Sequence, residues 1–335
     1  MLGSTWGLAL TVVGVIVLCA LAMAARTAVR VLRYWDQGSD AALQIGLENE
    51  TWLASTLVTM GLWLEIFSLV LVVMAADEFS GVLTGAMCAV GAFKANAFGL
   101  PLLVTKIISV FCCGGWLSLH RLDISSPAYP LARLKYLFLL CLLPLVGADI
   151  LLQTLYVARI RPDVITSCCS LLFDSAGTAD KNLFYLDDPD RLLRVFLLLS
   201  AILCVLMLVC RARRTTGAAV ITAILWALYF PLALYSVTTV ISPYIYAMPF
   251  HHCPFCILKA EYHFIGYGIY LFLFLAAFFG VVSALFAVLR DTPGLRETAG
   301  GRLRSACGLS LIFFVLFFLF SFVHPLLYHF FGGEW

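Results

Sequence analysis

Charged residues are scarce in this chain of 335 residues. Asp, Glu, Lys and Arg together make up 12% of the sequence, whereas hydrophobic residues make up 63%. A water-soluble protein of this size could not cover so much apolar surface, so the composition predicts a chain whose solvent is lipid. The net charge of +2, spread without a basic block, provides no electrostatic surface for nucleic acid, which we exclude as a partner.

The sequence also lacks the signatures of common soluble enzymes. It has no Walker A loop, no Gly-x-Gly-x-x-Gly, no His-Glu-x-x-His and no Gly-x-Ser-x-Gly. The alternation of polar and apolar residues that is typical of membrane strands is absent as well. A large independent catalytic domain is therefore not expected.

Long apolar runs are what the sequence has instead. A helix needs about 20 apolar residues to cross a hydrocarbon core of roughly 30 Å. The runs predict an all-α integral membrane protein, a polytopic bundle that forms a single transmembrane domain over residues 1–335. Its helices are expected near residues 8–28, 53–75, 100–118, 136–157, 193–210, 217–240, 264–289 and 306–328.

Lys and Arg are distributed unevenly between alternate loops. If the N-terminus is outside, thirteen lie in cytoplasmic loops and six in outer loops. The positive-inside rule then predicts that both termini are non-cytoplasmic, in a membrane that we expect to be the bacterial cytoplasmic (inner) membrane. Residues 1–7 carry no Lys or Arg, which favours a retained first helix over a cleaved signal peptide.

The twelve cysteines fall into two sets on this topology. For the seven in helices or at their cytoplasmic ends we expect simple packing; these are Cys19, Cys112, Cys113, Cys141, Cys204, Cys210 and Cys307. The five in outer loops are Cys88, Cys168, Cys169, Cys253 and Cys256. Adjacent cysteines such as Cys168 and Cys169 rarely bond to each other, so we expect one of them to pair with Cys88.

The sharpest motif is His-His-Cys-Pro-Phe-Cys at residues 251–256, just before the seventh predicted helix. The Cys-x-x-Cys spacing brings two sulfurs together, and a helix N-terminus beside an imidazole stabilises a thiolate. The same residues offer ligands for Cu(I) or Zn(II). Three interpretations stay open: thiol–disulfide exchange, a metal site formed by His251, His252, Cys253 and Cys256, and a structural disulfide or inert pair.

The Cys-Pro-Phe-Cys tetrapeptide resembles the active-site motif of glutaredoxins, which have a soluble α/β fold. In a membrane chain, residues 250–259 are more similar to the membrane thiol oxidoreductases of the DsbB and vitamin K epoxide reductase type, whose core has four helices. The resemblance implies a thiol–disulfide oxidoreductase in which Cys253 attacks, Cys256 resolves, and His251 or His252 supports the thiolate. It also implies a periplasmic thiol protein as partner and a quinone as electron acceptor.

Two other classes of function compete with this interpretation. In the first, the chain binds or translocates copper or zinc, with Cys88 as a further ligand and a periplasmic metal carrier as its partner. In the second, it is a non-enzymatic membrane subunit or assembly factor, and its cysteines form structural disulfides.

Three ionisable residues lie deep in the apolar runs: Glu65, Lys106 and Asp149. Each costs several kcal/mol unless it faces a partner or water. We expect them in one layer, roughly 15, 9 and 12 Å from the outer ends of their helices. They form either an ion pair that fixes helix register or part of a proton or ion path that also serves a metal translocator.

Aromatic residues and prolines follow the sixth predicted helix, over residues 242–250. The prolines are expected to keep this segment out of a helix, and the tyrosines are typical of a membrane interface. Further imidazoles on the predicted outer side are His263, His324 and His329.

Overall fold

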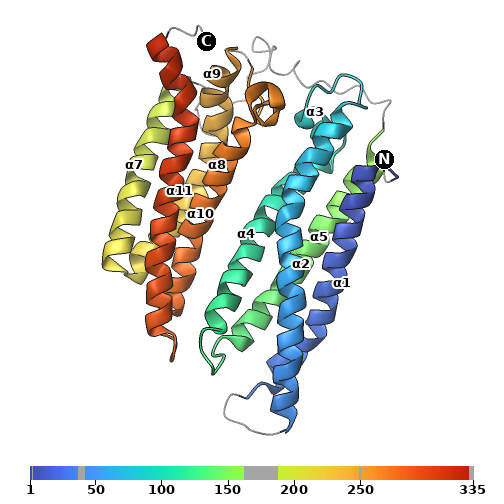
Figure 1. Cartoon of the computed structure of the whole chain (residues 1–335), viewed down its shortest axis with the longest axis vertical. Helices are drawn as coiled ribbons and strands as arrows, with labels where there is room; N and C mark the ends of the chain where they lie inside the picture. The colour runs from blue at the N-terminus through green and yellow to red at the C-terminus, as the bar shows by residue number, and fades with distance from the viewer. Residues whose placement is uncertain (2, 37–41, 162–187, 249–250, 332–335) are drawn as a thin grey trace. The chain divides into compact units, whose positions relative to one another are not determined.

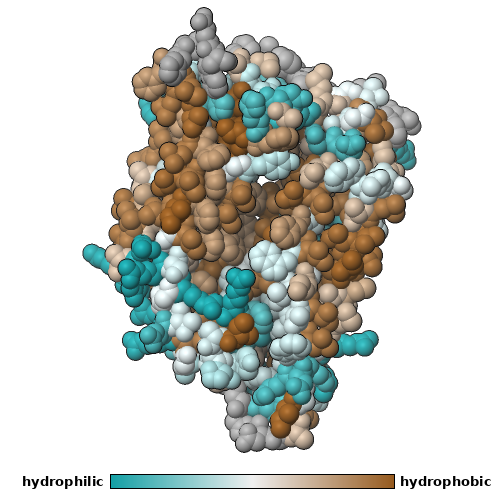
Figure 2. All heavy atoms as spheres, viewed as in Figure 1, coloured by the Kyte–Doolittle hydropathy of each residue, from teal (hydrophilic) through white to brown (hydrophobic). Residues whose placement is uncertain are grey.

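The computed structural model describes residues 1, 3–36, 42–161, 188–248 and 251–331 (Figure 1). These ranges are helical and contain no strand. Within them, eight helices are long and apolar enough to cross a membrane, which confirms the all-α membrane class. Figure 2 shows hydrophobic side chains over much of the face that it draws, as expected for a surface in contact with a lipid bilayer.

The chain divides into two compact units, and the first comprises residues 1–166 with the short stretch 291–298. Its helices are α1 (Thr5–Tyr34), α2 (Ala42–Ser80), the short α3 (Ala89–Lys94), α4 (Gly99–Asp123) and α5 (Ala132–Arg159). The four long helices form a closed ring, because α1 contacts α2, α2 contacts α4, α4 contacts α5 and α5 contacts α1. Side chains that point into this ring are shielded from lipid.

Small residues let the helices of the first unit approach closely. A methyl group added at Gly14 of α1 would lie 3.0 Å from the side chain of Ile150 on α5. One added at Gly61 of α2 would lie 3.3 Å from the Cβ of Ala20 on α1. In lipid, excluding water does not drive helices together, so this close packing holds the ring.

The second helix is longer than its apolar run. The sequence predicted residues 53–75, whereas α2 extends over Ala42–Ser80. Its first turns mix apolar and polar residues, and the polar side chains pair with neighbours: Gln44 donates to Glu48 at 3.1 Å, and Glu50 forms an ion pair with Arg30 of α1. A hydropathy pattern detects only the part of a helix that lies in lipid.

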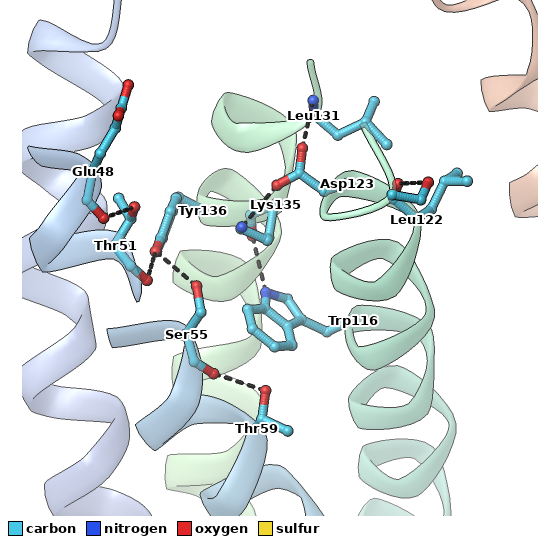
Figure 3. A network of polar contacts seen from close by, with 11 residues as sticks. Glu48, Thr51, Ser55, Thr59, Trp116, Leu122, Asp123, Leu131, Lys135 and Tyr136 are labelled. Atoms are coloured by element: carbon cyan, nitrogen blue, oxygen red, sulfur yellow. Dashed lines mark hydrogen bonds and ion pairs between the residues drawn. The ribbon is translucent and has the colours of Figure 1, made fainter. Parts of the chain in front are cut away.

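A polar network ties α2, α4 and α5 together at one end of the first unit (Figure 3). Asp123 of α4 forms an ion pair with Lys135 of α5, 2.8 Å from Nζ to Oδ2. Trp116 donates its indole N–H to the carbonyl of Lys135 at 3.0 Å. The hydroxyl of Tyr136 lies 3.1 Å from that of Ser55 on α2. The polar side chains named here therefore each have a partner on a neighbouring helix.

The second unit contains the other four long helices and one short one. These are α7 (Pro189–Arg213), α8 (Thr216–Ser236), the short α9 (Ser242–Tyr246), α10 (Ile265–Val288) and α11 (Arg296–Phe331, its first residues being grouped with the first unit). Helix α8 contacts α7 and α10. Aromatic rings attach α11: Phe317 packs against Phe196 of α7, and Phe313 stacks on Phe272 of α10.

The sixth spanning helix continues further than predicted. A π-helical turn, Val237–Ile241, joins α8 to α9. Pro243 lies directly after this π-helical turn, at the start of α9, and the altered backbone bonding of the turn accommodates its missing N–H. The prediction that the prolines keep this segment out of a helix is therefore wrong for residues 242–246. Ala247 then ends α9 in the left-handed conformation, with φ of 52°.

Candidate functional site

The cysteine loop, defined here as residues 251–264, connects α9 to α10. Two short 3-10 helices lie within it, Cys256–Leu258 and Ala260–Tyr262, before α10 begins at Ile265. Cys256 is therefore the first residue of a three-residue helix and not of the long one. So short a helix has little dipole, and the expected support of a thiolate by a long helix N-terminus is not realised.

Two tyrosine hydroxyls fix the backbone of this loop. Tyr246, the last residue of α9, donates to the carbonyl of Cys253. Tyr270 of α10 donates to the carbonyl of Pro254 at 2.7 Å. The Tyr246 ring also packs against the imidazole of His251, with 4.5 Å between ring centroids. Apart from the presence of tyrosines on both sides of the motif, nothing in the residue pattern indicates these contacts.

The two cysteines of the motif differ in exposure. Cys253 is 2% exposed, whereas Cys256 is partly exposed. Their sulfur atoms lie within 4.8 Å of each other. The cysteine loop therefore brings two sulfur atoms close together within the second unit.

Cys88 directly precedes α3 and is 1% exposed. Its carbonyl accepts the N–H of Gly91 at 3.0 Å, which fixes the start of that helix. Cys168 and Cys169, its predicted disulfide partners, lie outside the described residues. That pairing therefore stays a prediction.

The two histidines of the motif have different surroundings. Burial lowers the pKa of His251 below its ordinary value of 6.5, so its imidazole is neutral at neutral pH. The Nδ1 atom of His252 is buried and has no hydrogen-bond partner among the described residues. Such a nitrogen can accept a proton or bind a cation. Of the other predicted imidazoles, His263 lies at the end of the cysteine loop, and His324 and His329 lie on α11.

The three intramembrane ionisable residues come together inside the first unit. Lys106 on α4 places its Nζ atom 2.9 Å from Oε1 of Glu65 on α2. The same ammonium forms an ion pair with Asp149 on α5 and donates to the hydroxyl of Ser68 at 2.9 Å. All three ionisable side chains are at most 1% exposed.

A second pair of cysteines meets in the interior of the second unit. The sulfur of Cys210, near the end of α7, lies 2.9 Å from that of Cys307 on α11. One turn away, the Ser310 hydroxyl lies 3.1 Å from the sulfur of Met207. Both cysteines are among those expected only to pack, because the spacing of residues in sequence does not show which helices lie together.

Comparison with known proteins adds no family to this description. No family model, no curated protein and no solved structure matches the chain. Its function is therefore argued from the chemistry of its own residues.

Proposed function

We propose that the cysteine loop is a thiol–disulfide exchange centre at one face of the membrane. The observation that carries this proposal is the placement of the Cys253 and Cys256 sulfurs within 4.8 Å of each other, in a loop held by Tyr246 and Tyr270. A disulfide needs a sulfur separation of about 2.05 Å, which side-chain rotation in a Cys-x-x-Cys segment can reach. The tyrosines then hold the backbone in both redox forms.

The exchange proceeds by two thiolate attacks. A thiolate of the partner attacks the sulfur of Cys256, the more exposed residue of the Cys253–Cys256 disulfide, and Cys253 leaves as a thiolate. The partner's second thiolate then attacks the mixed disulfide, and Cys256 leaves. The partner dithiol becomes a disulfide, and two electrons and two protons pass to the two cysteines. Exposure thus favours Cys256 as the reacting sulfur, the reverse of the order expected from the sequence.

His252 has a place in this reaction. A leaving thiolate needs a proton, and an attacking thiol must lose one. The buried Nδ1 of His252, without a partner in the described residues, provides a nitrogen that can take and return that proton. Proton transfer at this atom is the role that we assign to it.

Glutathione tests the proposal without knowledge of the partner. Purified protein equilibrated in glutathione redox buffers should interconvert between a dithiol and a disulfide at Cys253 and Cys256, as read by mass mapping after alkylation. Cys253→Ser should accumulate a glutathione mixed disulfide at Cys256, because the second cysteine can no longer release it. Cys256→Ser should accumulate far less at the buried Cys253.

Cys204→Ser on α7, which removes a cysteine remote in sequence from the motif, is the matched control and should behave as wild type. A wild-type pair that shows no interconversion across the whole range of buffers would exclude the exchange function. Equal trapping in both single variants would exclude the assignment of Cys256 as the reacting sulfur.

Copper or zinc binding is a second candidate function, favoured by the Cys253 and Cys256 sulfurs and by the buried Nδ1 of His252 in the same loop, which has no partner among the described residues. Thiolates with an imidazole nitrogen suit Cu(I) and Zn(II). Metal analysis separates the two functions. If the loop binds metal, wild-type protein should retain copper or zinc through purification, and the Cys253→Ser, Cys256→Ser double variant should lose it. Wild-type protein that carries no metal and gains two thiols on mild reduction supports exchange instead.

The membrane context of the proposal follows from charge. We propose that both termini lie on the non-cytoplasmic side of a bacterial inner membrane, because most Lys and Arg residues lie in the loops on the opposite side. The cysteine loop would then face the periplasm, where a soluble thiol protein or a metal carrier can reach Cys256. Quinone is the electron acceptor that the short motif resemblance implies.

A further inference from the structure

The buried cluster of Glu65, Lys106 and Asp149 has unequal numbers of acidic and basic groups. Two carboxylates face one ammonium, and none of the three side chains is more than 1% exposed. Fully ionised, the cluster carries a net charge of −1. Among the described residues, the buried face of α1 contributes no ionisable side chain, and α4 adds only the thiol of Cys113 near the cluster.

An uncompensated charge in the interior of a membrane protein is strongly unfavourable. A single proton removes it, because one carboxyl then stays neutral while the other pairs with Lys106. Two carboxylates that share one site with a single cation bind such a proton readily. We propose that Glu65 and Asp149 share one exchangeable proton, and that this cluster is a proton-binding site within the membrane, independent of the thiol exchange proposed above.

Buried polar atoms continue from the cluster along one face of α5. Neither oxygen of Asp149 makes a hydrogen bond of regular geometry within the described residues, although the carboxylate is paired with Lys106. One turn further, Gln153 donates to the carbonyl of Leu10 at 2.9 Å, while its own Oε1 has no partner there. The hydroxyl of Tyr156, almost one turn beyond, is buried without a partner as well.

This row leads to the C-terminal end of α5. There, Asn96 next to α3 donates to the carbonyl of Tyr156 at 3.0 Å, and Phe93 stacks on the Tyr156 ring. Side chains at i, i+4 and i+7 lie on one helix face, so Asp149, Gln153 and Tyr156 line a single track. Polar groups spaced in this way suit proton transfer through bound water.

In the other direction the same face of α5 is apolar. Leu139, Leu142 and Val146 are at most 1% exposed and carry no polar group. They separate Asp149 from the polar network of Figure 3 at the opposite end of the unit. The proton-binding site is therefore connected to one side of the membrane and closed toward the other.

The ion pair of Asp123 with Lys135 in Figure 3 can be compared with the cluster of Glu65, Lys106 and Asp149. Asp123 and Lys135 are also buried, but one carboxylate faces one ammonium, and Asp123 additionally accepts the N–H of Leu131 at 2.9 Å. That pair is neutral when both groups are ionised. It needs no proton, so a variant of Asp123 should leave the proposed proton undisturbed.

Infrared spectroscopy of the full-length protein in lipid nanodiscs tests the proposal, because a protonated carboxyl absorbs apart from a carboxylate. Wild-type protein at neutral pH should show the band of one buried carboxylic acid, shifted in D₂O and lost at high pH. Asp149→Asn and Glu65→Gln should each remove the band, since one carboxylate then matches one cation. Asp123→Asn should keep it.

Wild-type protein without such a band would overturn the proposal even if every variant failed to fold. A band that persists in both Asp149→Asn and Glu65→Gln would also overturn it. A titration that shifts with sodium concentration at constant ionic strength would overturn the assignment to a proton and identify a sodium ion as the ligand.

The track along α5 is tested by the rate at which the band of the buried carboxylic acid shifts after transfer to D₂O. Gln153→Leu should slow this exchange several-fold, while the conservative Gln153→Glu should leave it fast. Leu142→Ala, in the apolar stretch, should not slow it. Equal rates in wild-type and Gln153→Leu protein would exclude the track along α5.

Discussion

Replacing Lys106 with a neutral residue should destabilise the protein more than most substitutions at its surface. Lys106→Met leaves Glu65 and Asp149 facing each other without a cation. Breaking a buried ion pair from one side costs about 3–5 kcal/mol, so we expect a marked loss of stability. The fraction of protein that survives heating in detergent, measured by gel filtration, reports it.

The control for this variant restores charge balance. A triple variant, Lys106→Met with Glu65→Gln and Asp149→Asn, has no buried charge left to compensate and should recover much of the lost stability. If the triple variant were as unstable as Lys106→Met alone, the loss would come from packing around the lysine stem and not from charge.

Tyr246 contacts the cysteine loop through its hydroxyl, which donates to the carbonyl of Cys253, and through its ring, which packs against His251. Tyr246→Phe leaves the carbonyl of Cys253 without its donor, at an expected cost of about 1–3 kcal/mol. The loop should then open more often, so alkylation of the 2% exposed Cys253 should become faster. Tyr244→Phe, two residues earlier on α9, is the control. Unchanged alkylation of Cys253 in Tyr246→Phe would show that other contacts hold the loop.

At the scale of elements, the pair Cys210 and Cys307 connects α7 to α11. Sulfurs 2.9 Å apart are already close to bonding distance, and neither side chain is more than 1% exposed. A small membrane-permeant oxidant such as diamide should therefore join the two helices by a disulfide, detected as one cross-linked peptide by mass spectrometry. Cys210→Ala should abolish this peptide.

The matched comparison is Cys204, which lies on α7 and has no sulfur partner among the described residues. It should stay available to a permeant alkylating agent after the same oxidation. Free thiols at both Cys210 and Cys307 after oxidation would contradict the geometry of this helix contact.

The helices themselves were largely predictable, for a physical reason. Lipid requires about 20 apolar residues per crossing, so each spanning helix leaves a long apolar run in the sequence. What could not be predicted is the part of a helix that lies outside lipid. Residues 42–52 are helical although polar residues interrupt their apolar pattern, and the helix continues past Pro243 because a π-helical turn precedes it.

The site was predictable only in part, because contacts between helices are not encoded in local spacing. The sequence identified Glu65, Lys106 and Asp149, since charge is expensive in lipid wherever it occurs. It also drew attention to Cys253 and Cys256. It gave no indication of the row on α5 or of the Cys210–Cys307 contact, which depend on which faces meet.

At the scale of the whole molecule, the distribution of charge predicts how the chain crosses the membrane. Arg211 and Arg213 lie in the last turn of α7 and Arg214 follows directly, so residues 211–214 form a basic segment. Helix α8 with α9, then α10, then α11 are three crossings that separate this segment from Trp335. An odd number of crossings places the two points on opposite sides, and the arginines favour the cytoplasm for the first.

Reporter fusions check this arrangement. Green fluorescent protein joined after Arg214 should fluoresce, because that reporter matures in the cytoplasm, whereas the same reporter after Trp335 should stay dark. Alkaline phosphatase, active only outside the cytoplasm, should give the opposite pattern at both points. A fluorescent fusion after Trp335 together with a dark one after Arg214 would invert the topology. The cysteine loop would then face the reducing cytoplasm, where a stable Cys253–Cys256 disulfide is not expected and a metal site becomes the better explanation of the same sulfurs.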